Sequence, residues 1–203
     1  MEKTTTDYPK VVRCKNLLSV MIQPLEHQHV NALIGMLKTL SPEQQALLPN
    51  DVNDPQYSSL IHQQLDDGTV HRLVAWHGTQ EILGSLALYP GTSRWMKHTA
   101  RITQVVHPNF RRAGIGTVLL DEVLTMAENH GIRKVYCELT SRHNEAVDMV
   151  KGIGFKREAT LRNHMEDEQG NEHDLYIYAL SVEDASMMLT ERMFKYVRMD
   201  YKA

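Results

Sequence analysis

Residues 104–119 read Gln-Val-Val-His-Pro-Asn-Phe-Arg-Arg-Ala-Gly-Ile-Gly-Thr-Val-Leu, and this stretch decides the fold. It begins as a β-branched strand that Pro108 ends, and Gly114 and Gly116 then open an amphipathic helix. Glycine lets backbone N–H groups approach an anion closely, and a helix N-terminus carries about half a positive charge. Arg111 and Arg112 add two cations beside those donors. The stretch therefore predicts a loop that binds a diphosphate.

Other glycine-rich loops match this stretch less well. A dinucleotide-binding fingerprint needs a third glycine where Leu119 stands, although Glu138 lies at roughly the interval expected for the carboxylate that binds ribose. A Walker loop needs Gly-Lys-Ser/Thr, which the sequence lacks. The remaining alternative is an ordinary surface helix that starts with glycine and carries two solvated arginines.

A second stretch extends the pattern. Residues 144–147, Asn-Glu-Ala-Val, begin a predicted helix that runs to Gly152-Ile153-Gly154-Phe155. Together with the acetyl-CoA-loop pattern Arg/Gln-x-x-Gly-x-Gly/Ala at 111–116 and the strand end at 105–108, it resembles the signatures of the GNAT superfamily of N-acetyltransferases. The resemblance covers roughly residues 19–181. It implies an α/β (α+β) fold with a mixed, mostly antiparallel twisted sheet flanked by helices.

The chain of 203 residues is long enough for one domain with an appendage. We expect a loose polar arm over 1–17 and the acetyltransferase-like domain over 18–181. A C-terminal helical extension is predicted over 182–203, because Ser181 and Asp184 have the spacing of a helix cap. This extension lies outside the resemblance, and we expect it to pack on the domain or on the second subunit of a homodimer.

Apolar periodicity predicts alternating strands and helices within the domain. The expected strands are 18–24, 70–76, 82–89, 100–106, 134–139, 155–161 and 174–180. The expected helices are 26–40, a short one from Pro42, 57–65, 115–130 and 146–153.

Composition excludes several classes of function. The net charge of −3 and the absence of a long basic run disfavour nucleic-acid binding. No apolar run approaches the ~20 residues of a membrane span, and the polar start is not that of a signal peptide. Cys14 and Cys137 stand far apart and are expected to be reduced thiols in a cytoplasmic protein. The eleven histidines are scattered, so we expect no metal site.

The resemblance implies acetyl-CoA as cosubstrate. It places the pantetheine beside Val105 and Val106, where the family's strand is usually bulged and its backbone groups are free. Asn144 is implied at the start of the second signature. The residues implied for the diphosphate loop are Arg111, Arg112, Ala113, Gly114, Ile115, Gly116 and Thr117.

The catalytic groups are where the sequence departs from the family pattern. Many relatives place an acid tyrosine five residues before the phenylalanine of Gly-Phe, and Val150 stands there; the glutamate base of others falls at Arg101. His143 is the first substitute, because an imidazole with a pKa of about 6.5 serves as acid or base near neutrality. Glu138 is the second. A solvated histidine and a paired surface carboxylate are their ordinary structural alternatives. The weaker substitutes are His107, Tyr176 and Tyr178.

The expected function is transfer of an acetyl group from acetyl-CoA to a primary amine of a small molecule or protein, by direct attack in a ternary complex. The missing tyrosine suggests an alternative, a CoA-binding regulatory module without turnover. Residues 26–65 are implied to shape the acceptor site, and they match no narrower pattern that would name the amine.

Overall fold

The computed structural model describes residues 8–14, 18–78, 81–167 and 169–185. Over these residues the strands form an eight-stranded sheet in the order β1-β2-β3-β4-β5-β6-β8-β7. Every neighbouring pair is antiparallel except β5 and β6. The strands are β1 (Lys10–Arg13), β2 (Ser19–Pro24), β3 (His71–His77), β4 (Glu81–Pro90), β5 (Thr99–Val106), β6 (Lys134–Thr140), β7 (Lys156–Glu166) and β8 (Glu172–Ser181). The mixed, mostly antiparallel sheet predicted from the sequence is confirmed.

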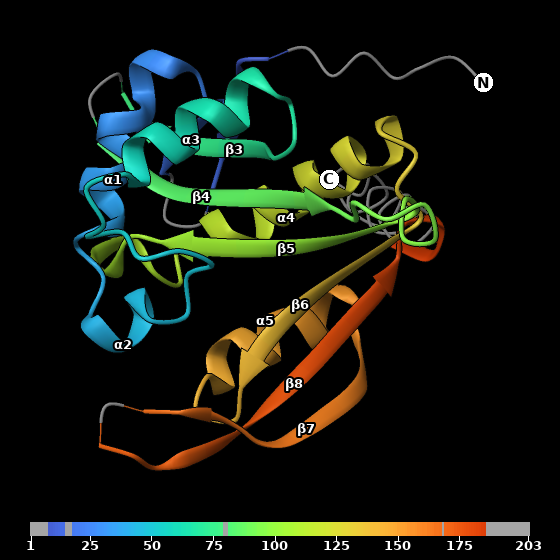
Figure 1. Cartoon of the computed structure of the whole chain (residues 1–203). Helices are drawn as coiled ribbons and strands as arrows, with labels where there is room; N and C mark the ends of the chain where they lie inside the picture. Colours follow the sequence, from blue (N-terminus) through green and yellow to red (C-terminus); the bar gives the residue numbers. More distant parts are fainter. Residues whose placement is uncertain (1–7, 15–17, 79–80, 168, 186–203) are drawn as a thin grey trace, which may run out of the picture.

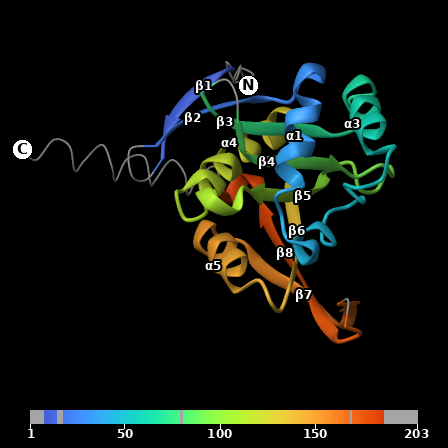
Figure 2. The same ribbon diagram turned by 90° about the vertical axis from the view of Figure 1, so that its left-hand side faces the viewer.

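Helices cover both faces of the sheet, as Figure 1 and Figure 2 show. On one face lie α4 and α5, and on the other lie α1 and α3. The short α2 lies near the place where β5 and β6 separate. The α-helices are α1 (Val30–Leu37), α2 (Pro42–Gln45), α3 (Tyr57–Asp66), α4 (Ile115–Asn129) and α5 (Asn144–Ile153), with 3₁₀ turns η2 (His27–His29) and η3 (Pro108–Phe110).

Each helical layer encloses its own apolar core. The first core lies under α4 and α5 and includes Leu119, Val123 and Val150. The second lies under α1 and α3 and includes Leu33 and Ile61. The apolar stripes predicted at helical spacing are therefore the buried faces of these helices, and each stripe fixes which side of its helix meets the sheet.

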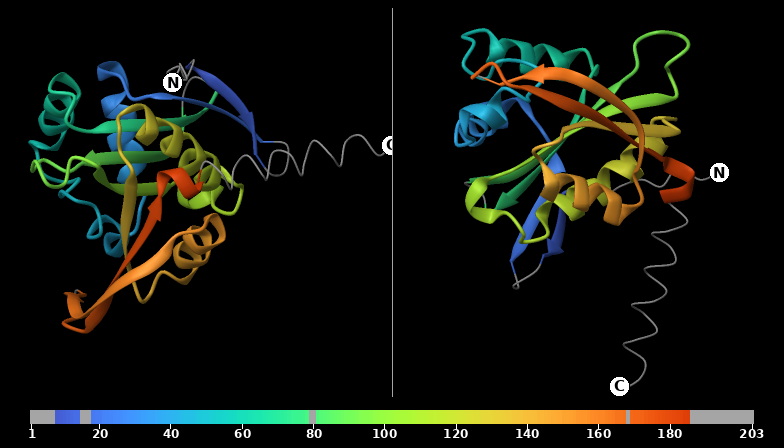
Figure 3. Two further views of the ribbon diagram at one scale, coloured as in Figure 1. Left: turned by 90° about the vertical axis from the view of Figure 1, so that its right-hand side faces the viewer. Right: turned by 90° about the horizontal axis from the view of Figure 1, so that it is seen from below.

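The parallel pair β5 and β6 determines where the site lies. Their pairing covers only three positions, Thr99–Arg101 against Lys134–Tyr136. Beyond them β5 continues along β4 while β6 continues along β8, so the two halves of the sheet diverge (Figure 1 and Figure 3). This divergence leaves the second half of β5 without a neighbour on one edge.

The structure changes two of the predicted elements. The loose polar arm is wrong for Lys10–Arg13, which form β1 and pair with β2 from Lys10↔Ile22 to Arg13↔Ser19. The β7–β8 hairpin is longer than predicted, because β7 continues to Glu166 across an irregularity between Leu161 and Met165. Neither segment alternates apolar and polar residues as a half-buried strand does. Lys10–Arg13 has two consecutive valines between two cations, and residues 162–166 are mostly polar.

The chain beyond β8 is described only in part. Residues 182–185 are helical, and Ser181 Oγ accepts a hydrogen bond from the backbone N–H of Asp184 at 3.4 Å, as the predicted cap requires. The rest of the predicted C-terminal extension, 186–203, lies outside the described residues. Within the part that is described, no helix is long and apolar enough to cross a membrane.

Candidate active site

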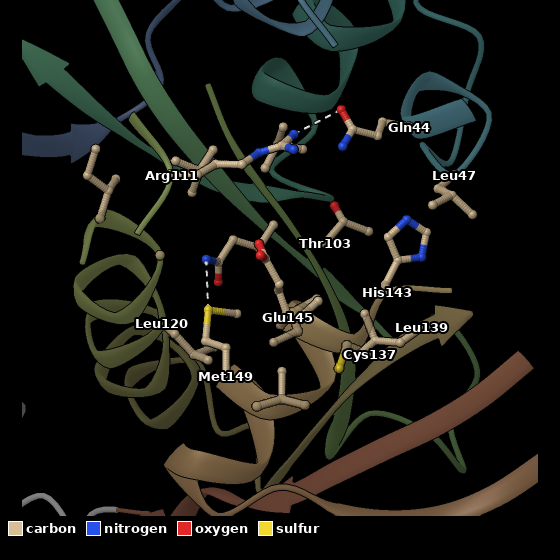
Figure 4. A pocket seen from close by; sticks show the side chains of 18 of the residues that line it. Gln44, Leu47, Thr103, Arg111, Leu120, Cys137, Leu139, His143, Glu145 and Met149 are labelled. Atoms are coloured by element: carbon tan, nitrogen blue, oxygen red, sulfur yellow. Dashed lines mark hydrogen bonds between the residues drawn. The ribbon is translucent and has the colours of Figure 1, made fainter. Parts of the chain in front are cut away.

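A cavity of about 730 Å³ lies where β5 and β6 diverge. Its walls come from both strands, from the first two turns of α4 and α5, and from the segment that contains α2. Figure 4 shows side chains from these elements turned toward one space. All of the sequence-implied cofactor residues line this cavity except Ala113, which packs against the first core instead.

The glycines of the loop have separate structural reasons. Gly114 precedes α4 with a φ of +92°, a left-handed conformation that favours glycine. Gly116 lies in the first turn of α4, and a Cβ atom there would come within 2.3 Å of Gln104 Nε2. The loop therefore needs glycine at 114 for its turn, and a Cβ at 116 would push aside the end of the Gln104 side chain; with no side chain at 116, the first turn of α4 is open to a ligand.

Both arginines of the loop contact residues across the cavity. Arg111 Nη2 donates to Gln44 Oε1 of α2 at 2.9 Å, and Arg112 forms an ion pair with Glu145 of α5. The hydrogen bond from Arg112 and its charge hold the pKa of Glu145 below its usual range. These groups are exposed, so the contacts are weak and can be exchanged for a phosphate.

The free edge of β5 supplies backbone donors and acceptors. The N–H of His107 donates to Leu83 O, toward β4. Backbone N–H and C=O groups alternate in direction along an antiparallel strand. The backbone groups of Val106 and Gln104 therefore point into the gap between β5 and β6, whereas those of Val105 point toward β4.

The expected bulge is wrong, since the β4–β5 register runs unbroken from Gly84↔Val106 to Pro90↔Ala100. Divergence of β6, rather than a bulge, exposes the backbone. Of the two valines implied for the pantetheine, Val106 therefore has its backbone groups at the gap, and Val105 contributes its side chain to the wall.

Gln104 is a site residue that the sequence reasoning missed. Its Oε1 is buried without a hydrogen-bond partner, and its Nε2 has only a weak contact with Met149 Sδ at 3.8 Å. An unpaired buried acceptor costs free energy, so this oxygen suits a ligand donor. The signal was available in the strand pattern, because Gln104 is the polar residue between Ile102 and Val106 on the face that meets α4.

His143 occupies the N-cap position of α5, and its side chain lies in the cavity near Thr103 and Leu47 (Figure 4). Its Nδ1 is 2.6 Å from Thr140 Oγ1. Burial lowers the pKa of His143 from 6.5, and the charges of Arg142 and Arg111 lower it further while Glu43 opposes them. The imidazole is therefore neutral at pH 7 and can accept a proton.

The other candidates differ in what surrounds them. Glu138 lines the cavity and its Oε2 is 3.1 Å from Arg101 Nη1, an ion pair at the closed end of the gap. Val150 also lines the cavity and has no proton to give. Burial raises the pKa of Cys137 to about 12, so this cavity-lining thiol is not a nucleophile near neutral pH.

The three weaker substitutes do not line the cavity. His107 Nδ1 accepts from the backbone N–H of Asn109 at 3.2 Å and caps η3. Tyr178 is buried in the first core, and the guanidinium of Arg157 lies 4.9 Å from the ring centre of Tyr176. Their roles in the described structure are packing and capping.

Comparison with known proteins places the chain among acetyltransferases. Residues 36–155 match the model of the acetyltransferase (GNAT) family. The chain is 30% identical over 77 residues to the ribosomal protein bS18-alanine N-acetyltransferase of Salmonella typhimurium, a match that covers 38% of this chain and about half (51%) of that relative. The corresponding Escherichia coli enzyme is 24% identical over 99 residues, which cover 49% of this chain and 66% of the relative.

Solved structures share the fold. A Streptococcus mutans protein superimposes with a TM-score of 0.70 at 24% identity, covering 79% of this chain and 98% of that one. A putative acetyltransferase from Salmonella typhimurium, solved with its cofactor acetyl-CoA, gives a TM-score of 0.69 at 16% identity, covering 80% and 94% of the two chains.

Proposed function

This chain belongs to the acetyltransferase (GNAT) family, and we propose that it transfers the acetyl group of acetyl-CoA to a primary amine. The observation that supports this activity most strongly is the joining of three features in one cavity. A glycine-opened helix N-terminus, a strand edge with unpaired backbone groups and a neutral imidazole meet where β5 and β6 diverge.

The residues present fit acetyl-CoA. The first turn of α4 offers backbone N–H groups to a diphosphate, and Gly116 keeps that turn free of a side chain. The edge groups of Val106 can pair with the amides of an extended pantetheine arm. The unpartnered Oε1 of Gln104 lies beside this edge and can accept a further hydrogen bond.

Acetyl-CoA supplies an acetyl group activated as a thioester, and the protein must then present a neutral amine to it. A primary ammonium has a pKa of about 10.4 in water, so a proton has to leave. His143 is neutral and lines the cavity, which suits it to accept that proton directly or through water. Glu138 is a less suitable base because Arg101 neutralises it.

Direct attack by the amine is favoured over an acyl-enzyme. Cys137 is the only cysteine among the described residues that line the cavity, and its raised pKa keeps the thiol protonated. The reaction then needs both substrates bound together. The curated relatives act on an alanine of a ribosomal protein, so a protein amine and a small-molecule amine are both acceptors to test.

The test is turnover on a broad amine panel, followed by release of free thiol from acetyl-CoA. We expect turnover on at least one class of primary amine and identification of the N-acetylated product by mass spectrometry. Calorimetric titration with acetyl-CoA runs in parallel. Binding of acetyl-CoA without turnover of any amine would contradict the proposed activity and leave a binding module.

A further inference from the structure

One part of the cavity is apolar, and we call it the acceptor chamber. It is the part lined by Leu40, Leu47, Leu48 and Val105. Leu40 belongs to the second core, and Leu48 and Val105 pack against that core, so the chamber lies on the α1–α3 face of the sheet. Gly116 and Met149, by contrast, lie with α4 and α5 on the opposite face. The diphosphate loop and the acceptor chamber thus occupy different sides of β5.

Leu47 is the chamber residue that a ligand meets first. Its exposed fraction is 38%, whereas Leu40 is 5% exposed. Figure 4 shows Leu47 beside His143 and Thr103, on the side of the cavity away from Met149. An apolar side chain is therefore presented next to the imidazole that is suited to accept the proton of the amine.

Among the described residues, the wall of the acceptor chamber contains no carboxylate to hold a second ammonium. The two carboxylates that line the rest of the cavity are Glu138 and Glu145. Glu138 is ion-paired with Arg101, and Glu145 belongs to α5, which lies on the face of the sheet opposite the chamber.

At the rim, Arg142 Nη1 lies 3.2 Å from both Glu43 Oε1 and Asp167 Oδ2. Asp167 also accepts hydrogen bonds from His173 and Asn171, which hold its pKa well below the usual range. Glu43 and Asp167 at this rim thus share the guanidinium of Arg142.

We infer that the acceptor is a primary amine carried on an uncharged, apolar group. This inference rests on the proposed function and names the chemistry of its acceptor. An apolar group gains free energy when it leaves water for the leucine wall. A second ammonium placed there loses its hydration without gaining a partner, which is unfavourable. The same chemistry is offered by a small apolar amine and by a peptide N-terminus whose first side chain is apolar.

The first experiment compares substrates that differ only in whether they carry a second ammonium. Hexylamine and 1,6-diaminohexane have the same chain and differ in one terminal ammonium. We expect kcat/KM for hexylamine to exceed that for the diamine by about tenfold or more per amino group, since a charged group left without a partner in a pocket is strongly rejected. The peptide arm compares Leu-Gly-Gly-Gly with Glu-Gly-Gly-Gly. If only the small amines or only the peptides are acetylated, the result identifies which of the two kinds of acceptor the protein uses.

The second experiment introduces one carboxylate into the acceptor chamber, which should favour the diamine over hexylamine. Leu47→Glu should lower kcat/KM for hexylamine and raise it for 1,6-diaminohexane, so that the ratio between them falls about tenfold or inverts. Leu161→Glu is the matched control, because Leu161 is also 38% exposed and stands on β7 outside the cavity. Leu47→Gln separates the effect of charge from that of lost apolar surface, and calorimetry with acetyl-CoA checks that each variant is intact.

The outcomes separate this inference from the proposed function. Turnover with equal or better use of the diamine by the wild type would overturn the apolar acceptor and leave acetyl transfer standing. An unchanged substrate ratio in folded Leu47→Glu would also overturn it. Binding of acetyl-CoA without turnover of any amine would overturn the proposed function itself. A fall in the ratio for Leu47→Glu but not for Leu47→Gln or Leu161→Glu would support the chamber as the structure presents it.

Discussion

Single residues decide whether the cavity can hold its cosubstrate, and Gly116 is the clearest of them. A Cβ atom there would lie 2.3 Å from Gln104 Nε2 and 3.2 Å from Met149 Sδ. We expect Gly116→Glu to weaken acetyl-CoA binding by about a hundredfold or more, because it adds both bulk and a negative charge at the diphosphate donors. Calorimetry measures the loss. Gly35→Glu is the control, since that helical glycine has open space around it. Wild-type affinity in folded Gly116→Glu would contradict the assignment.

His143 predicts the pH dependence. Because burial lowers its pKa below 6.5, the imidazole is an effective base above that value and is lost as a base when pH falls through the lowered pKa. We expect kcat at saturating substrates to rise with pH below about 6.5 and then level off. His143→Gln should lower the maximal kcat and abolish its rise with pH below about 6.5. A profile that climbs steadily toward the pKa of the amine in the wild type would mean that no protein base is used.

Cys137 tests the direct route of transfer. A thiol with a pKa of about 12 is protonated in the working range, so it should neither react quickly with thiol reagents nor become acetylated. We expect Cys137→Ala to keep kcat within about threefold of the wild type while costing about 1 kcal/mol of stability, because the thiol is buried. Initial rates should give intersecting lines when both substrates are varied. Parallel lines together with loss of activity in Cys137→Ala would indicate an acyl-enzyme instead.

At the scale of elements, the free edge of β5 makes a prediction about the backbone alone. The N–H of Val106 faces the gap, whereas that of Val105 faces β4. Proline removes the N–H, and it is tolerated in a strand only where that group has no sheet partner. Val106→Pro should therefore fold and lose acetyl-CoA affinity by about tenfold, whereas Val105→Pro should lose about 3 kcal/mol of stability. Equal stability of the two variants in urea unfolding would contradict the assigned directions.

Most of the elements could be predicted from the sequence because their apolar residues recur at strand or helix spacing. The capping signals were also local, as at Ser41, whose side chain accepts from the N–H of Gln44 in α2. The prediction failed for β1 and for the end of β7, which lie at the two edges of the sheet and do not alternate apolar and polar residues. These segments are strands because they pair with an adjacent strand, not because of apolar periodicity. The adjacent strand is known only once the chain has folded.

At the scale of the whole molecule, the site joins segments that are distant in the sequence. The contact of Arg111 with Gln44, and those of Arg142 with Glu43 and Asp167, bring α2 and the β7–β8 hairpin to the cavity. The loop signature predicted the diphosphate side, because its residues are consecutive. The leucines opposite it have no such signature, since they and Val105 of β5 form a common wall only in the folded chain.

Ligand binding should stabilise the whole molecule if the cavity is preformed. Acetyl-CoA that binds only the folded chain adds about 2.7 kcal/mol at a free concentration one hundred times its Kd. We expect the Tm to rise steadily with acetyl-CoA concentration and to rise far less for Gly116→Glu at the same concentrations. A Tm that rises equally in this variant would show that the ligand binds elsewhere.

The most direct test of the central claim is a crystal structure of the protein with acetyl-CoA. We expect the diphosphate on the backbone N–H groups of the turn at Gly114 and Gly116, and the pantetheine along the edge groups of Val106. The thioester should then lie in the gap between β5 and β6, with His143 on the acceptor side. Acetyl-CoA bound outside this gap, or with its diphosphate away from the first turn of α4, would contradict this placement of the site.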